Sequence, residues 1–162
     1  IGINAAERIA RAFQTSRLAT LRNMVNCYPK RCGLIIWKRD HKPSDSVPSP
    51  NQAELWDDLE GTGGPEKEVR VQWQDLGRKA RKEVHVPDDK SIDPDSLIAR
   101  ALEEGEGKVG RERVDLGGLT GEFEIEAVPF SAGEEPHVLS LFHWPPEMFA
   151  GQESLSNLQE SS

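Results

Sequence analysis

The sequence predicts an α+β fold: a small, mostly antiparallel β sandwich or barrel with one packed helix, a basic N-terminal helical arm and a polar C-terminal tail. Alternating apolar and polar residues, typical of half-buried strands, recur in the second half of the 162 residues. The segments between them are short and rich in Gly and Pro, which suits antiparallel hairpins better than parallel crossovers. Hydrophobic residues make up only 36%, below the usual fraction of about 45–50%, so part of the chain is expected to lie outside the core.

Residues 1–42 are expected to form the basic helical arm and the first strand. Asn4 followed by Glu7 is typical of an N-cap with its capping-box partner, and apolar residues at helical spacing extend the helix over roughly residues 5–25. Pro29 ends the helix, because the residue before a proline avoids helical backbone angles. The short apolar run at 34–37 predicts a buried strand.

Residues 43–66 are expected to form a Pro- and Gly-rich linker that contains one short helix. Ser49-Pro50 is a helix-start signature, since Pro is favoured at the first helical position. Leu55, Trp56 and Leu59 supply a short apolar face, and the glycines that precede Pro65 end the helix.

Residues 67–150 are expected to form the β-rich body, and residues 151–162 a polar tail. Alternation predicts strands near 69–73, 84–86, 111–116 and 122–128, and Asp93-Pro94 predicts the start of a helix that ends at Gly105. Glutamates at 122, 124 and 126 give one strand an acidic face. The last strand, 138–144, is apolar on both faces, which marks it as central in the sheet.

The charge is divided unequally along the chain. The formal charge of -8 combines nine basic and two acidic residues in the first 42 positions with 11 basic and 26 acidic residues in the remainder. The N-terminal segment therefore carries +7 and the rest carries -15. Such asymmetry indicates a polyanionic partner, or an acidic protein surface on which the basic segment docks.

No motif predicts catalysis, a cofactor or a metal centre. Cys27 and Cys32 lack the second ligand pair that a zinc site needs, so we interpret both as structural. The glycine clusters lack the sequence of a phosphate-binding loop, and the acidic pairs fit solvation better than acid–base chemistry. One alternative stays open, a small metal-binding barrel that uses His85, His137 and His143. The chain contains no apolar run long enough to span a membrane.

These observations predict a non-enzymatic structural or assembly protein whose arms dock on neighbouring subunits of a large intracellular particle. The particular hypothesis is an accessory subunit of a virion or phage particle, such as a decoration, head-completion or connector protein. It rests on an analogy with the architecture of such subunits, a compact β-rich body with terminal arms. The predicted interface residues are Arg8, Arg11, Phe13, Arg17, Arg22, Trp56, Trp144, Met148 and Phe149. The alternative partner is nucleic acid, with Lys30 and Arg31 joining the four arginines of the arm on phosphates.

Overall fold

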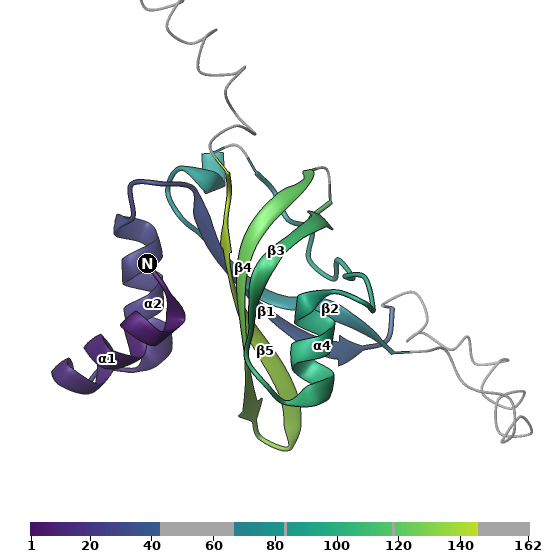
Figure 1. Cartoon of the computed structure of the whole chain (residues 1–162), viewed down its shortest axis with the longest axis horizontal. Coiled ribbons are helices and arrows are strands. Elements are labelled where there is room, and N and C mark those ends of the chain that lie inside the picture. Colours follow the sequence, from purple (N-terminus) through teal and green to yellow (C-terminus); the bar gives the residue numbers. More distant parts are fainter. Residues whose placement is uncertain (43–66, 83, 118, 146–162) are drawn as a thin grey trace, which may run out of the picture.

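The computed structural model describes residues 1–42, 67–82, 84–117 and 119–145. The helix expected in the 43–66 linker, the tail 151–162, and the predicted interface residues Trp56, Met148 and Phe149 lie outside the described residues. Within the described part, three α-helices accompany one five-stranded antiparallel sheet (Figure 1). The predicted α+β class with a packed helix is confirmed.

The sheet is open rather than closed. Its strands are β1 (Cys32–Asp40), β2 (Glu68–Leu76), β3 (Lys108–Asp115), β4 (Thr120–Ala132) and β5 (Glu135–His143). Their order is β2-β1-β5-β4-β3, and every neighbouring pair is antiparallel. The expected closure into a barrel is therefore wrong, and in the described part of the chain helices and loops, rather than a second sheet, cover the two faces.

The middle of the sheet is buried from both sides. β5 lies between β1 and β4, as its apolar composition predicts, and both sets of alternating side chains along it are buried. Leu139 and Leu141 belong to the core cluster on one face, whereas Val138 and Phe142 belong to the cluster on the other. The two clusters require two covering layers.

The basic N-terminal segment supplies one of these layers (Figure 1). It forms two helices, α1 (Ile3–Phe13) and α2 (Arg17–Cys27), where the periodicity predicts a single one. Gln14 ends α1 in a left-handed conformation, with φ of 53°, and the Ser16 Oγ accepts a hydrogen bond from the Ala19 N–H at 3.1 Å to begin α2. The resulting hairpin places Leu21 and other apolar residues on the sheet, so this segment is part of the body in the structure.

The second layer consists of α4 (Leu97–Glu104) and the loop segment that precedes it. The Ser96 Oγ accepts from the Ala99 N–H, so the helix begins four residues after the predicted Asp93 cap. Gly105 ends it as predicted, with φ of 69°. The expected strand at 84–86 is absent: Val84 and Val86 are buried, but they lie in a loop after the short 3-10 helix η2 (Ala80–Lys82).

A buried hydrogen-bonded pair joins the two central strands. The Trp37 Nε1–H donates to the Ser140 Oγ at 2.6 Å, and that hydroxyl donates to the Ile35 carbonyl at 3.2 Å. Both polar groups are thereby satisfied inside the core, where an unpaired donor would cost about 1–3 kcal/mol.

Two leucines of α2 provide a test of the helical layer. Leu21 is fully buried against the sheet, whereas Leu18 is 37% exposed. Leu21→Ala should lower the free energy of unfolding by about 2–5 kcal/mol, the usual cost of a cavity in a core. Urea denaturation followed by circular dichroism measures this loss. Leu18→Ala is the matched control and should lower it by no more than about 0.5 kcal/mol; equal effects would mean that the helices are not part of the folded core.

Candidate functional site

The helical hairpin exposes three large apolar side chains. Phe13, at the end of α1, is 74% exposed, and Ile9, one turn earlier, is 41% exposed. Leu18 of α2 also lies at the surface. We call these three residues the hairpin face. They make up three of the four large hydrophobic residues that are exposed in the described part of the chain, and Phe13 is one of the predicted interface residues.

The four arginines of the predicted interface fall into two groups. Arg17 forms an ion pair with Glu7 at 2.7 Å, which ties α2 to α1. Arg22 forms one with the buried Asp75 at 2.8 Å, and its guanidinium lies 5.5 Å from the centre of the Trp73 ring, which ties α2 to β2. Within the described residues, Arg8 and Arg11 make no ion pair and are exposed on α1.

Trp144 is a core residue in the structure, although the sequence suggested it as an interface anchor. Only 4% of it is exposed, and its ring meets the Phe123 ring edge-on at a centroid distance of 5.5 Å. Its position follows from strand alternation, because it continues the series of β5 side chains that includes Val138 and Phe142 on the α4 face.

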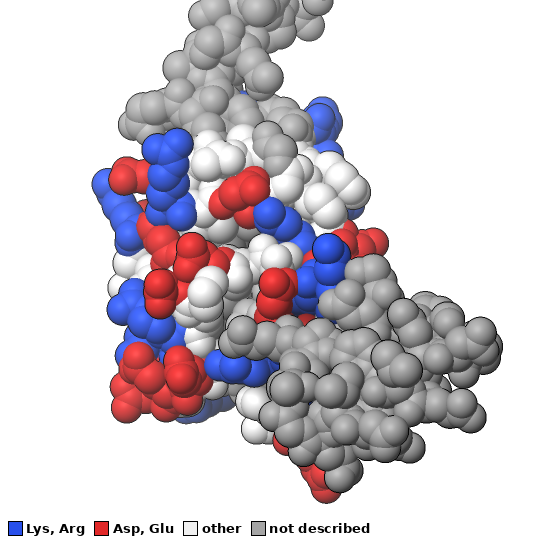
Figure 2. Space-filling view, turned by 90° about the vertical axis from the view of Figure 1, so that its right-hand side faces the viewer, with Lys and Arg blue, Asp and Glu red and all other residues white. Residues whose placement is uncertain are grey.

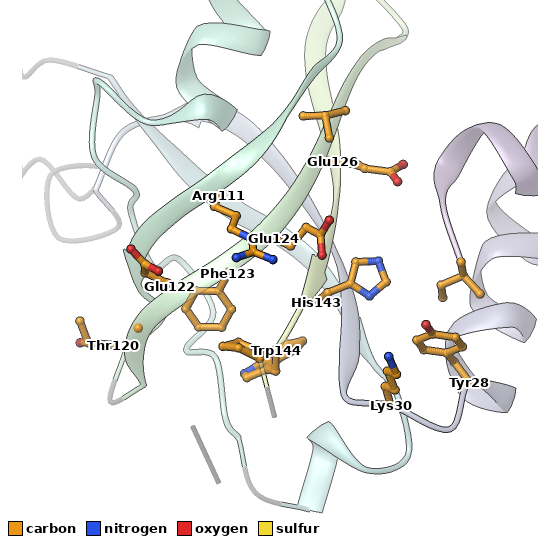
Figure 3. A pocket seen from close by; sticks show the side chains of 14 residues that line it. Tyr28, Lys30, Arg111, Thr120, Glu122, Phe123, Glu124, Glu126, His143 and Trp144 are labelled. Carbon is orange, nitrogen blue, oxygen red and sulfur yellow. The ribbon is translucent and has the colours of Figure 1, made fainter. Parts of the chain in front are cut away.

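A groove that sequence reasoning missed lies where β5 ends, beside the loop that joins α2 to β1 (Figure 3). Its volume is about 850 Å³. Most of the side chains around it come from β3, β4 and β5 and from that loop. The residues that carry its polar and exposed apolar chemistry are Tyr28, Lys30, Val109, Arg111, Glu122, Glu124, Glu126 and His143.

A row of side chains crosses the sheet at this groove. Arg111 of β3 is in register with Glu124 of β4, which is in register with His143 of β5, and His143 faces Cys32 of β1. Residues in register on neighbouring strands share one face, so the row carries a cation, a carboxylate, an imidazole and a thiol side by side. Alternation of the glutamates predicts an acidic face, but pairing between distant strands supplies the other members.

Glu126 fixes the helical layer beside the groove. Its Oε2 accepts a hydrogen bond from the Ile3 N–H at the start of α1 at 2.7 Å. A carboxylate at this position satisfies one of the unpaired N–H groups of the helix and interacts favourably with its dipole. One of the three glutamates is therefore structural, whereas Glu122 and Glu124 stay exposed.

The thiol and the imidazole of the row are both uncharged at neutral pH. Burial raises the pKa of Cys32 to about 11, and its Sγ donates to the Val25 carbonyl at 3.7 Å. Burial lowers the pKa of His143, whose ring meets the Tyr28 ring edge-on at 5.9 Å. A protonated thiol is a poor nucleophile, so this neighbouring cysteine and histidine lack the ionised sulfur of a cysteine–histidine catalytic pair.

The histidines proposed for a metal-binding barrel are not brought together. His85 is exposed in a loop, whereas His137 and His143 are separated by six residues of an extended strand, about 20 Å. The His137 Nδ1 lies 3.0 Å from the Glu135 carbonyl. Among the described residues, no group of three or more His, Cys, Asp or Glu side chains is placed to hold a metal ion, and the open sheet excludes the barrel itself.

Comparisons with protein-family models and with curated proteins give no match. No protein-family model describes this chain, and no curated protein is significantly similar to it. Within the part of the chain that the structure describes, none of the helices is long and apolar enough to cross a membrane. The functional argument therefore rests on the hairpin face and the groove.

The imidazole of His143 should make stability depend on pH. Its folded-state pKa lies below the ordinary value of about 6.5. The imidazole therefore binds a proton less readily in the folded protein than in the unfolded chain. The free energy of unfolding should therefore decrease as the pH falls from 7.5 to about 5.5. Urea denaturation across this range should show a weaker decrease for His143→Gln. His85→Gln, at an exposed position, is the control and should retain the wild-type slope.

The two thiols should differ in reactivity. Cys27 is exposed, whereas Cys32 is buried with its pKa raised to about 11. Iodoacetamide at pH 8 should alkylate Cys27 in the folded protein and reach Cys32 only after denaturation. Mass spectrometry of the digested protein reads both sites. Rapid alkylation of Cys32 under native conditions would contradict the buried position.

Proposed function

We propose that the protein is a non-enzymatic docking subunit of a larger assembly and that it engages its neighbours through the hairpin face. The observation that carries this proposal is the exposure of Phe13, Ile9 and Leu18 on a helical hairpin that packs on the sheet through other residues, Ile3, Ala6, Leu21 and Val25. A large aromatic side chain at the surface loses contact with water only when a partner covers it.

The charges around the hairpin face indicate the partner's chemistry. Arg8 and Arg11 are exposed on α1, the helix that also carries Ile9 and Phe13; Arg8 is adjacent to Ile9, whereas Arg11 lies on the far side of the helix from Phe13. Aromatic residues and arginines are the types that most often dominate binding energy at protein interfaces. Positive charge at the rim favours an acidic partner and speeds the encounter with it. The proposed partner is therefore a protein surface with an apolar pocket and carboxylates beside it.

Nucleic acid is the less favoured partner. Two of the six cations proposed for phosphate contacts, Arg17 and Arg22, are held in ion pairs with Glu7 and Asp75. A third, Lys30, lines the groove. On the side of the molecule that carries α4, basic and acidic side chains are interspersed and form no uniform basic field (Figure 2). The narrower hypothesis of a virion or phage accessory rests on the analogy drawn from the sequence and stays a prediction.

Site-specific photocrosslinking tests the docking function. A benzophenone amino acid at position 13 should form protein adducts in an extract of the native source, and the same group at the exposed Glu103 of α4 should form few. Arg8→Glu combined with Arg11→Glu should reduce the adducts at position 13, because it reverses the charge that selects an acidic partner.

Two results would overturn the proposal. The first is equal labelling from positions 13 and 103. The second is labelling that disappears on nuclease treatment, together with binding to a random DNA duplex that weakens steeply with salt; this pair of results would favour the nucleic-acid alternative.

A further inference from the structure

The two edges of the sheet differ in how the described chain covers them. The β2 edge is paired with the segment that leads to α4: the Val71 N–H donates to the Lys90 carbonyl at 3.0 Å. The Ile92 N–H donates to the Val69 carbonyl at the same distance. At the opposite edge, β3 has backbone hydrogen bonds to β4 alone among the described residues. It contains no proline and pairs with β4 without a bulge, so it is an open template for another strand.

The β3–β4 hairpin identifies which backbone groups of β3 point outward. The Leu116 N–H donates to the Leu119 carbonyl at 3.0 Å, and this pair continues the register of β3 with β4. Hydrogen-bonded and non-hydrogen-bonded pairs alternate along antiparallel strands, so the even-numbered residues of β3 bond to β4. The N–H and C=O groups of Val109 and Arg111 therefore point away from β4, at the open edge.

The C-terminal end of this edge is occupied by the loop before α4. The Lys90 ammonium forms an ion pair with Asp115 at 2.9 Å. Pro87 lies so close to Gly117 that a Cβ on the glycine would be 2.3 Å from the proline Cδ. An incoming strand therefore has room beside the first residues of β3, 108–112, and not beside the last ones.

These first residues are complementary to themselves. In a twofold antiparallel pairing centred on Gly110, Lys108 of one copy stands opposite Glu112 of the other. Val109 then stands opposite Arg111, and their outward backbone groups meet as a hydrogen-bonded pair, with about four interchain bonds in all. A pairing centred on Arg111 would set that arginine against itself, and one centred on Glu112 would oppose two carboxylates.

The pairing about Gly110 covers an apolar side chain. Val109 is 72% exposed and is the only large exposed hydrophobic residue of the described chain outside the hairpin face. Across the twofold axis the two copies of Val109 are diagonal neighbours on one face of the sheet. The aliphatic stems of the Arg111 side chains lie beside them, so the contact removes both valines from water.

The same pairing supplies a counter-charge to Glu112. This carboxylate is half-buried and accepts one hydrogen bond, from the Leu97 N–H at 2.6 Å, but it forms no ion pair within the described residues. Burial raises its pKa, although the charge of Arg100 acts in the opposite direction. A lysine from a second copy would stabilise the ionised form.

Lys108 is able to make this additional contact. It forms ion pairs with Glu104 and, at 3.8 Å, with Glu106. An ammonium group has three N–H donors, so it can hold Glu104 and reach a carboxylate of a second copy as well.

We propose that two copies of this chain associate through their β3 edges, in antiparallel register about Gly110, and join their five-stranded sheets into one. The inference goes beyond the docking proposed for the hairpin face and does not depend on it. A twofold contact uses the open edge of both copies, and the β2 edge is covered over Val69–Val71, so association ends at the dimer. The interface is small and belongs to the weak, reversible class, with an expected Kd of about 0.1 mM.

A proline at position 109 tests the use of the open edge. Val109→Pro removes an outward N–H that β4 does not use, and an edge strand tolerates proline at such a position. Val109→Thr keeps the N–H and a β-branched side chain, and is the matched control. Circular dichroism and the urea midpoint verify that both variants fold.

Sedimentation velocity of the full chain, from about 10 μM to about 1 mM, provides the readout. The wild type and Val109→Thr should show a reversible equilibrium between monomer and dimer. Val109→Pro should associate at least about tenfold more weakly, because each copy loses an interchain hydrogen bond.

Disulfide formation tests the register. In a Cys27→Ser background, a mixture of Val109→Cys and Arg111→Cys chains should form a disulfide-linked dimer on mild oxidation. Residues of a hydrogen-bonded pair have Cα atoms about 5.5 Å apart, which a disulfide can bridge. Either variant alone should form much less, because its cysteines are diagonal neighbours about 7–8 Å apart. A non-reducing gel measures the linked dimer.

Five outcomes would overturn the proposal. These are a wild type that stays monomeric up to about 1 mM, species larger than dimers, a folded Val109→Pro variant that associates as well as the wild type, a cysteine mixture that forms no linked dimer, and an Arg111→Cys chain that links alone as well as the mixture does. If Val109→Pro does not fold, the disulfide pattern decides. Crosslinking from position 13 reports docking of the hairpin face separately.

Discussion

Burial of the two central strands from both sides is the constraint on which the rest of this structure depends. β1 and β5 carry apolar side chains on both faces, so one covering layer leaves half of them in water. α4 and the loop before it cover one face, and the hairpin of α1 and α2 covers the other. The basic N-terminal segment is therefore required by the core, although its composition suggests an arm outside the body.

Polar contacts decide where the helical layer sits on the sheet. Burial of Leu21 and Val25 is non-directional and would tolerate several placements. Glu126 at the start of α1 and Asp75, which receives both Arg22 and Arg81, select one of them. Glu126 belongs to β4 and Asp75 to β2, the two strands that flank the central pair β1 and β5. The hairpin is therefore held at two positions across the width of the sheet.

The two candidate surfaces follow from the same arrangement. The hairpin packs mainly over β1 and the strands beside it, so the outer side chains of β3 and β4 on that face remain exposed, and the groove lies beside them. Phe13, one turn beyond the buried Ala10, and Ile9, beside it on the helix, remain exposed at the C-terminal half of α1. One layer that is narrower than its sheet thus leaves exposed apolar residues on the hairpin and a groove lined by both carboxylates and cations in the same molecule.

The sequence by itself determined the α+β class, the central position of β5, the helix that ends at Gly105 and the unequal division of charge. Each depends on local periodicity, end signals or counting, which need no knowledge of distant contacts. Only the tertiary structure decided that the sheet is open, that Trp144 is a core residue and that α1 and α2 form a covering layer. It alone brought Arg111, Glu124, His143 and Cys32 into one row. Pairing between strands that are distant in the sequence sets these features. The residues of one strand do not by themselves identify the strand with which it pairs.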